Sequence, residues 1–174
     1  MDGMPGLTPA WGEVLAEAAS VCLAAEGHAI RTELKISGSF EESFLLERLD
    51  VSLQMALAHR NEEEATELGA CGIAILAVRS FTDLVVLHRS RKGTGFDYWL
   101  SAEGEPLLQR GERLEVSGIR KGTEAAIKGR TSEKIKQTQR FRTDSPAWIA
   151  IVEFSRPLLR LMKVSRPALR IMKP

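Results

Sequence analysis

The segment between residues 61 and 154 changes its hydrophobic pattern in an order that few folds can accommodate. Asn61 and the three acids after it are typical of a helix start, and a mostly apolar run from Leu68 to Val78 continues that helix. Thr123 is placed to cap a second, basic helix that extends to about Gln139. Four β-prone stretches accompany these helices, at 84–87, 96–100, 114–117 and 148–154.

The order is therefore helix, three strands, helix, strand, which predicts an α/β or α+β fold with a mixed central sheet flanked by helices. Ahead of it, Trp11–Glu26 carries one apolar helical stripe, and Ile30–Ile36 alternates apolar and polar residues as a half-buried strand does. Phe44–Val51 is predicted as the return strand of a hairpin. We expect one domain over residues 1–154, with its core at about 61–154 and a helix–hairpin extension in front.

Composition excludes several classes of protein. The longest uninterrupted apolar run, Ile73–Val78, is six residues, far short of a membrane span. The N-terminal residues are acidic and do not resemble a secretory signal. Two cysteines, Cys22 and Cys71, provide neither a disulfide framework nor a paired metal motif. We expect a soluble, cytoplasmic protein with no membrane partner.

The net charge of +1 conceals an asymmetry between the two halves of the chain. Residues 1–83 carry 5 Lys/Arg against 14 Asp/Glu, whereas residues 84–142 carry 13 against 7 and residues 143–174 carry 6 against 2. The second half is thus a candidate surface for nucleic acid or for an acidic protein partner. The alternative is that the two halves neutralise each other in the folded domain.

Two carboxylates carry the best chemical signal. Asp97 lies centrally in one predicted strand, and Glu115 lies in the next, where Ser117 projects from the same face. Carboxylates on neighbouring strands can share a hard divalent cation, whose preferred ligands are oxygens. The alternatives are an Asp at an exposed sheet edge and a Glu that pairs with Arg113 or Arg120.

With these residues the chain resembles the PD-(D/E)XK nuclease superfamily, over about residues 61–154. The resemblance implies a restriction-endonuclease-like α-β-β-β-α-β core, with Asp97 as the acid of the second core strand and Glu115-Val116-Ser117 at the place of the Glu-x-Lys motif. It also implies an acid from the first helix, Glu64 or Glu67, and Mg²⁺ or Mn²⁺ as the cofactor of an active enzyme.

Ser117 departs from the family pattern, because a hydroxyl group has no permanent charge to replace the motif lysine. Some members supply this lysine from the following helix, which makes Lys121 and Lys128 the candidates here. Solvated lysines on an ordinary helix face are the alternative. The candidate substrate-binding residues are Arg91, Lys92, Ser117, Arg120 and Gln137.

A short repeat ends the chain: residues 155–163 recur as residues 165–173, identical at seven of nine positions. We assign residues 155–174 to a basic tail and expect the residues after about Lys163 to be unnecessary for folding. The tail either docks a partner or is a recent duplication, and a homodimer is possible on this basis.

Three functions remain open from sequence. The first is a metal-dependent nuclease that acts on the phosphodiesters of nucleic acid. The second is an inactive module on the same fold that binds nucleic acid or protein. The third is an immunity-type or accessory protein whose tail docks a partner.

Overall fold

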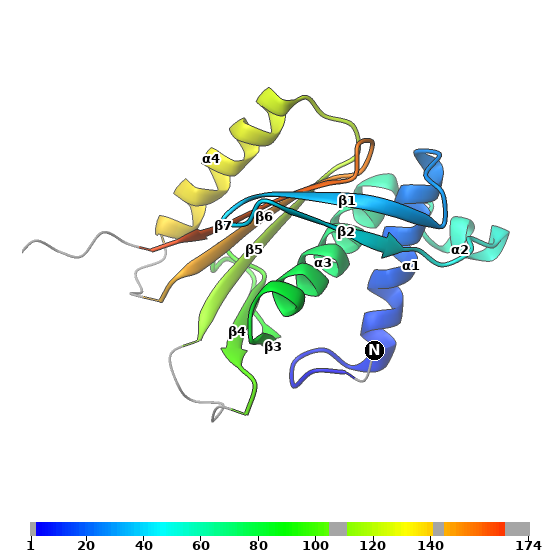
Figure 1. Ribbon diagram of the computed structural model, residues 1–174. Helices are drawn as coiled ribbons and strands as arrows, with labels where there is room; N and C mark the ends of the chain where they lie inside the picture. The colour runs from blue at the N-terminus through cyan, green and yellow to red at the C-terminus, as the bar shows by residue number, and fades with distance from the viewer. Residues whose placement is uncertain (1–2, 105–110, 141–144, 166–174) are drawn as a thin grey trace, which may run out of the picture.

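The computed structural model describes residues 3–104, 111–140 and 145–165. Four helices and seven strands form this part of the chain (Figure 1). In chain order they are α1 (Pro9–Ala25), β1 (Arg31–Gly38), β2 (Glu42–Glu47), α2 (Leu53–Ala58), α3 (Glu62–Phe81), β3 (Leu84–Arg89), β4 (Tyr98–Ala102), β5 (Glu112–Ile119), α4 (Glu124–Arg140), β6 (Ala147–Glu153) and β7 (Leu158–Val164).

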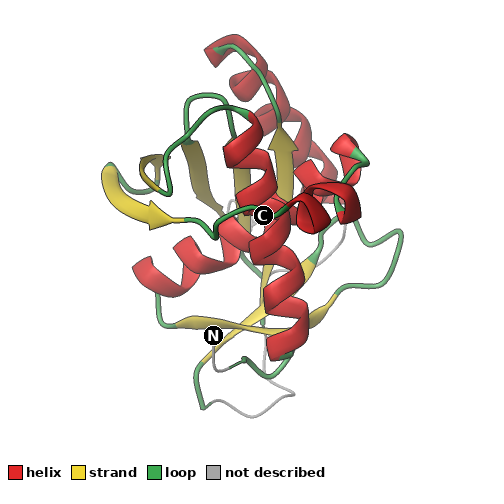
Figure 2. Ribbon diagram, turned by 90° about the vertical axis from the view of Figure 1, so that its right-hand side faces the viewer, coloured by secondary structure: helices red, strands yellow, loops and turns green. Residues whose placement is uncertain are grey.

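All seven strands belong to one mixed sheet, in the order β2-β1-β7-β6-β5-β4-β3. Strands β3, β4 and β5 form an antiparallel meander, and β6 then pairs parallel to β5 after the α4 crossover. Strand β7 pairs antiparallel to β6 and parallel to β1, whose other neighbour is the antiparallel strand β2. The sheet is therefore mixed, with two parallel and four antiparallel pairs of neighbouring strands, and helices pack against it (Figure 2).

Helices cover both faces of this sheet (Figure 1). On one face α1 and α3 pack against each other and enclose the main core, which includes Leu15, Ile73 and Leu114. On the other face α4 packs against β5, β6 and β7 over a smaller cluster of Ile127, Ile149 and Ile151. Neighbouring residues of β5 and β6 therefore point into different layers of the molecule.

The mixed α and β architecture confirms the prediction from sequence. Residues 84–154 supply four adjacent strands, with α4 packed on them. The side chain of Asn61 accepts a hydrogen bond from the Glu64 N–H at 3.3 Å, and Thr123 accepts one from Ala126 at 3.2 Å, so both helices begin at the expected caps. The N-terminal helix and hairpin are also present, although the hairpin joins the same sheet and its second strand ends at Glu47.

The assignment of residues 155–174 to a tail requires correction. Residues 158–164 form β7 in the interior of the sheet, where Leu159 and Leu161 are fully buried. The alternation of these leucines with Arg160 and Met162 is a half-buried strand pattern, and the basic composition of the repeat concealed it. The second copy, residues 166–173, lies outside the described residues.

Candidate active site

Strand β5 is longer than its neighbour β4, and this leaves part of its edge open. The two strands pair from Leu114 to Glu112, and beyond Leu114 no strand of the described part lies on this side of β5. The chain bends at Asp97, directly before β4, and the Asp97 Oδ2 accepts a hydrogen bond from the Val116 N–H at 2.8 Å. The expected mid-strand position of Asp97 is thus wrong: its carboxylate replaces a strand partner at the open edge.

Glu115 points from β5 toward α4 and is only 2% exposed. Its Oε1 lies 2.5 Å from the Nζ of Lys134 and accepts a second hydrogen bond from the Gln137 Nε2 at 3.1 Å. Lys134 and Gln137 are three residues apart on α4, so they project from the same helix face. One buried carboxyl is therefore held by a cation and an amide.

Burial and crowding shift the acidity of both carboxyl groups. Burial and the nearby Asp97 charge, against the opposing effect of Lys134, together raise the pKa of Glu115 to about 7. Burial also raises the pKa of Asp97, while the Val116 N–H and the Lys134 ammonium group oppose that rise. Because one carboxyl disfavours ionisation of the other, the pair would gain from additional positive charge.

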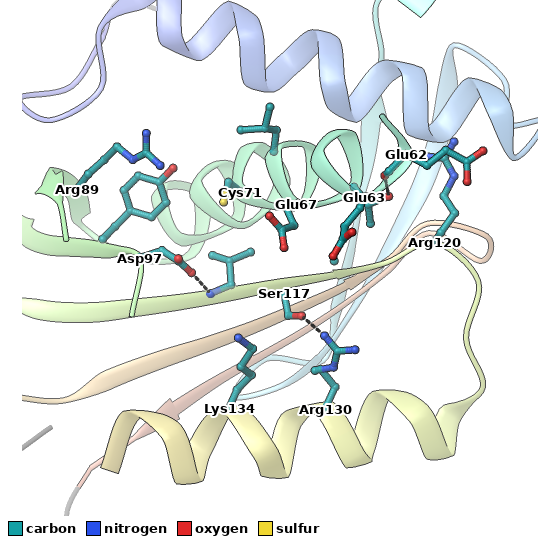
Figure 3. Close-up of a pocket in the computed structure, with 15 residues that line it drawn as sticks. Glu62, Glu63, Glu67, Cys71, Arg89, Asp97, Ser117, Arg120, Arg130 and Lys134 are labelled. Carbon is teal, nitrogen blue, oxygen red and sulfur yellow. Dashed lines mark hydrogen bonds between the residues drawn. The ribbon is translucent and has the colours of Figure 1, made fainter. Parts of the chain in front are cut away.

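Helix α3 brings further acids to the same place. Glu63 and Glu67 lie one turn apart and line a cavity of about 520 Å³ together with Asp97 and Ser117 (Figure 3). The close approach of α3 depends on Gly118, since a Cβ atom there would lie 2.4 Å from the Thr66 carbonyl oxygen. Figure 3 shows the α3 acids on one side of β5, and Lys134 and Arg130 rising from α4 on the other.

A second cavity, of about 500 Å³, adjoins the first, since Arg89, Asp97 and Lys134 line both. It extends along the loop between β3 and β4, where Arg91 and Lys92 are exposed. The two cavities form a groove that is acidic beside α3 and basic beside this loop. We call it the Asp97 groove.

Several sequence candidates do line this groove. Glu67 and Arg120 line the first cavity, and Arg91, Lys92 and Gln137 line the second.

Ser117 and Arg120, like Gln137, are already engaged with other side chains. Ser117 also lines the first cavity, where its hydroxyl group accepts a hydrogen bond from Arg130 at 3.0 Å. Arg120 is paired with Glu26 at 3.1 Å. Both polar groups are therefore held in place from within the protein.

Three candidates lie elsewhere. Glu64 is exposed and does not line either cavity, whereas Glu67, three residues further along α3, lines the first. Lys121 is 73% exposed and pairs with Glu26 at 3.3 Å. Lys128 pairs with Glu124 at 3.8 Å on the outer face of α4. Neither lysine lines the groove.

Four residues that line the groove were missed in the sequence, and the most important of them is Lys134. The other three are Glu63, Arg89 and Arg130. A signal for it was present: Ile127 is the buried anchor of the sheet-facing side of α4, and steps of three and four residues from it reach Arg130 and Lys134. Lys128 lies outside this stripe, and its side chain is 64% exposed. Tracing the buried stripe would have selected Lys134.

The donor set has the chemistry that a hard divalent cation requires. Asp97 and Glu115 offer carboxylate oxygens, and Asp97 shares the first cavity with Glu67 and the second with Glu115. The pKa of Glu115 is raised mainly by burial and further by the negative charge of Asp97, which a bound cation would offset. Within the described ranges no three His, Cys, Asp or Glu side chains already form a ligand cluster. Lys134 occupies one Glu115 oxygen, so ion binding requires that contact to adjust.

Comparison with known proteins gives no match: no family model fits the sequence, and no curated protein or solved structure is significantly similar to it. No helix in the described part of the chain is both long and apolar enough to cross a membrane.

Proposed function

We propose that this chain is a metal-dependent nuclease of the PD-(D/E)XK type, in which Lys134 of α4 takes the place of the missing motif lysine. The convergence of Asp97, Glu115 and Lys134 at the open edge of β5 carries this proposal. The order of elements supports it as well, because α3-β3-β4-β5-α4-β6 follows the α-β-β-β-α-β order of that superfamily, with an antiparallel meander and a parallel last strand.

In this proposal Asp97 and Glu115 hold Mg²⁺ or Mn²⁺, with Glu67 as the acid from the first core helix. The bound ion would supply Lewis-acid stabilisation of a phosphodiester and lower the pKa of a water molecule. Glu115 must be ionised for this role, and its pKa of about 7 permits that near neutral pH. The Val116 N–H keeps the Asp97 carboxylate directed at the open edge.

Lys134 supplies the fixed positive charge that Ser117 lacks. Its ammonium group, held by Glu115 and by the Gln137 Oε1 at 3.3 Å, is positioned to stabilise negative charge that develops on a phosphoryl oxygen. Arg89, Arg91 and Lys92 provide further positive charge along the groove for neighbouring phosphates. The substrate is therefore nucleic acid, as the basic second half of the chain indicates.

A second candidate function is an inactive binding module on the same fold. The observation that favours it is the internal pairing of the site: Glu115 is satisfied by Lys134 and Gln137, and Ser117 by Arg130. In that case the loop between β3 and β4, with Arg91 and Lys92, would bind nucleic acid or an acidic protein without cleavage.

The two functions are separated by incubating the purified chain with labelled single- and double-stranded DNA and RNA, in Mn²⁺, in Mg²⁺ and in EDTA. The nuclease predicts cleavage that EDTA abolishes and that Asp97→Ala and Glu115→Ala both eliminate. Salt-dependent binding without cleavage in any metal would support the binding module and reject the nuclease.

A further inference from the structure

The outer edge of β2 carries an unusual concentration of exposed apolar side chains. Strand β2 ends the sheet and pairs only with β1 in the part of the chain that the structure describes. Leu45 of this strand is 64% exposed, and α2 beyond its end buries none of its residues (Figure 1). The large hydrophobic residues that are exposed among the described ones all fall between residues 30 and 57: Ile30, Leu45, Leu49, Leu53 and Leu57.

This edge is also acidic. Among residues 41–50 the exposed charged residues are Glu41, Glu42, Glu47 and Asp50. A free strand edge with exposed leucines and negative charge is a template for an added strand that is apolar and basic. We call residues 41–57 the β2 edge surface.

The C-terminal repeat has the complementary composition. Residues 165–174 contain no acid, and their bases are Arg166, Arg170 and Lys173. They also have the sequence of a strand, since Leu169 and Ile171 stand where the first copy has Leu159 and Leu161, the two buried leucines of β7. A near copy of β7 therefore follows β7 directly.

The second copy of the repeat, residues 165–173, cannot pair with the first copy as a neighbouring strand. Both edges of β7 are already paired, one with β6 and the other with β1. The other end of the sheet is unsuitable as well: the Gly6 N–H donates to the Val86 carbonyl at 2.9 Å and covers the β3 edge, where His88 and Arg89 add basic character. A basic strand is not favoured there.

The β2 edge of the same chain is out of reach for the second repeat. Strand β7 ends beside the β1–β2 turn, where the Lys163 N–H donates to the Ser39 hydroxyl at 2.8 Å. The outer edge of β2 lies three strand spacings from β7, about 14 Å, and the chain must also reverse around the hairpin to pair there. The four Cα–Cα steps from Val164 to residue 168 span at most about 14 Å when fully extended, which leaves no length for that reversal.

We propose that residues 168–173 of a second copy of this chain bind the β2 edge surface as an added strand. Reciprocal exchange of the two segments closes a symmetric dimer, in which each basic segment lies against the acidic edge of the other copy. The repeat then has a purpose distinct from folding. This inference is independent of the proposed nuclease activity.

The oligomeric state of the full chain tests this inference, measured by sedimentation equilibrium over a range of protein concentrations and salt. We expect a monomer–dimer equilibrium that salt weakens. Leu45→Asp on the edge and Arg170→Glu in the repeat should each raise the dimer dissociation constant at least tenfold. Lys136→Glu, a matched charge change on the exposed side of α4, should leave it unchanged. A monomer at every concentration, or a dimer that both variants leave intact, would overturn the proposal.

Disulfide trapping establishes which chain donates the strand. Leu45→Cys and Leu169→Cys variants, mixed and oxidised, should form a covalent dimer between the two different variants. Because Leu45 is exposed, its replacement does not disturb the core. A chain that carries both cysteines is the companion experiment. If it forms an efficient disulfide within one chain and no covalent dimer, donation of the strand by a second copy is contradicted.

Discussion

The Nζ of Lys134 lies 2.5 Å from the Oε1 of Glu115, joining α4 to β5 across the base of the Asp97 groove. Glu115 occupies the glutamate position of the proposed motif, and Ser117 occupies its lysine position. Lys134 thus brings an ammonium group from a different element to the carboxylate beside which a motif lysine would lie.

Glu115 should make the stability of the domain depend on pH. Its pKa rises from 4.5 to about 7 on folding, so the folded state holds the proton more tightly than the unfolded state. Its contribution to the free energy of unfolding is greatest below pH 4.5 and is lost as pH rises toward 7, by ~3 kcal/mol for a shift of this size. Urea unfolding of the wild type and of Glu115→Gln between pH 4.5 and 8 measures this effect.

We expect the stability difference between wild type and Glu115→Gln to move in favour of the variant as pH rises through this range, because the amide does not ionise. Asp97→Asn is the companion variant, since the pKa of Asp97 is also raised. A difference that moves in favour of the wild type with rising pH would mean that Lys134 lowers the Glu115 pKa overall, contrary to this account.

Gly118 should be essential for the position of α3. An added methyl group would meet the Thr66 carbonyl oxygen at 2.4 Å, so Gly118→Ala must displace α3 or β5. Overpacking of this kind typically costs about 1–3 kcal/mol. Thermal and urea unfolding measure the loss, and any nuclease activity should fall as well because Glu63 and Glu67 move with the helix.

Gly129 on α4 is the matched control. A Cβ atom there meets nothing within 4 Å, so Gly129→Ala should stabilise the domain by up to about 1 kcal/mol through helix propensity. Equal effects of the two substitutions would contradict the close packing of α3 on β5.

Binding of Mg²⁺ or Mn²⁺ should release a proton. Glu115 is partly protonated near neutral pH, and an ion that binds its carboxylate favours the ionised form. Calorimetric titrations in two buffers with different ionisation enthalpies should therefore give different apparent heats, and affinity should rise with pH through about 7. Glu67→Gln should weaken binding, whereas Glu64→Gln, an exposed neighbour outside the groove, should not. Equal heats in both buffers would exclude the proposed role of Glu115.

Much of the fold is predictable from local sequence pattern. Asn61 and Thr123 mark the starts of two helices, and the alternation around Glu115 gives the strand and places Leu114 and Val116 in the core. The pairing of β7 with β1 could not be predicted from local sequence, because it joins segments more than a hundred residues apart and no local signal encodes it. The pattern of β7 itself was readable, but its charges suggested a tail.

The candidate site was predictable in its carboxylates and not in its cation. Asp97 and Glu115 follow from the order of the strands, since each lies within a short β-prone stretch. Choosing Lys134 over Lys128 requires the rotation of α4 on the sheet, which the sequence encodes only through the few apolar residues of a largely polar helix. The same uncertainty of helix rotation separates Glu67 from Glu64.

The most direct test of the account is the single-turnover rate of Mn²⁺-dependent cleavage of a labelled oligonucleotide by three forms of the chain: wild type, Lys134→Ala and Lys128→Ala. The two lysines lie on the same helix, so the variants are matched in composition and net charge. We predict that Lys134→Ala lowers the rate by about 10²–10³, the usual loss when one electrostatic group is removed from an active site, and that Lys128→Ala leaves it within about twofold of wild type. Equal rates for the two variants, or no cleavage by the wild type in any metal, would contradict the assignment of Lys134 and the nuclease that depends on it.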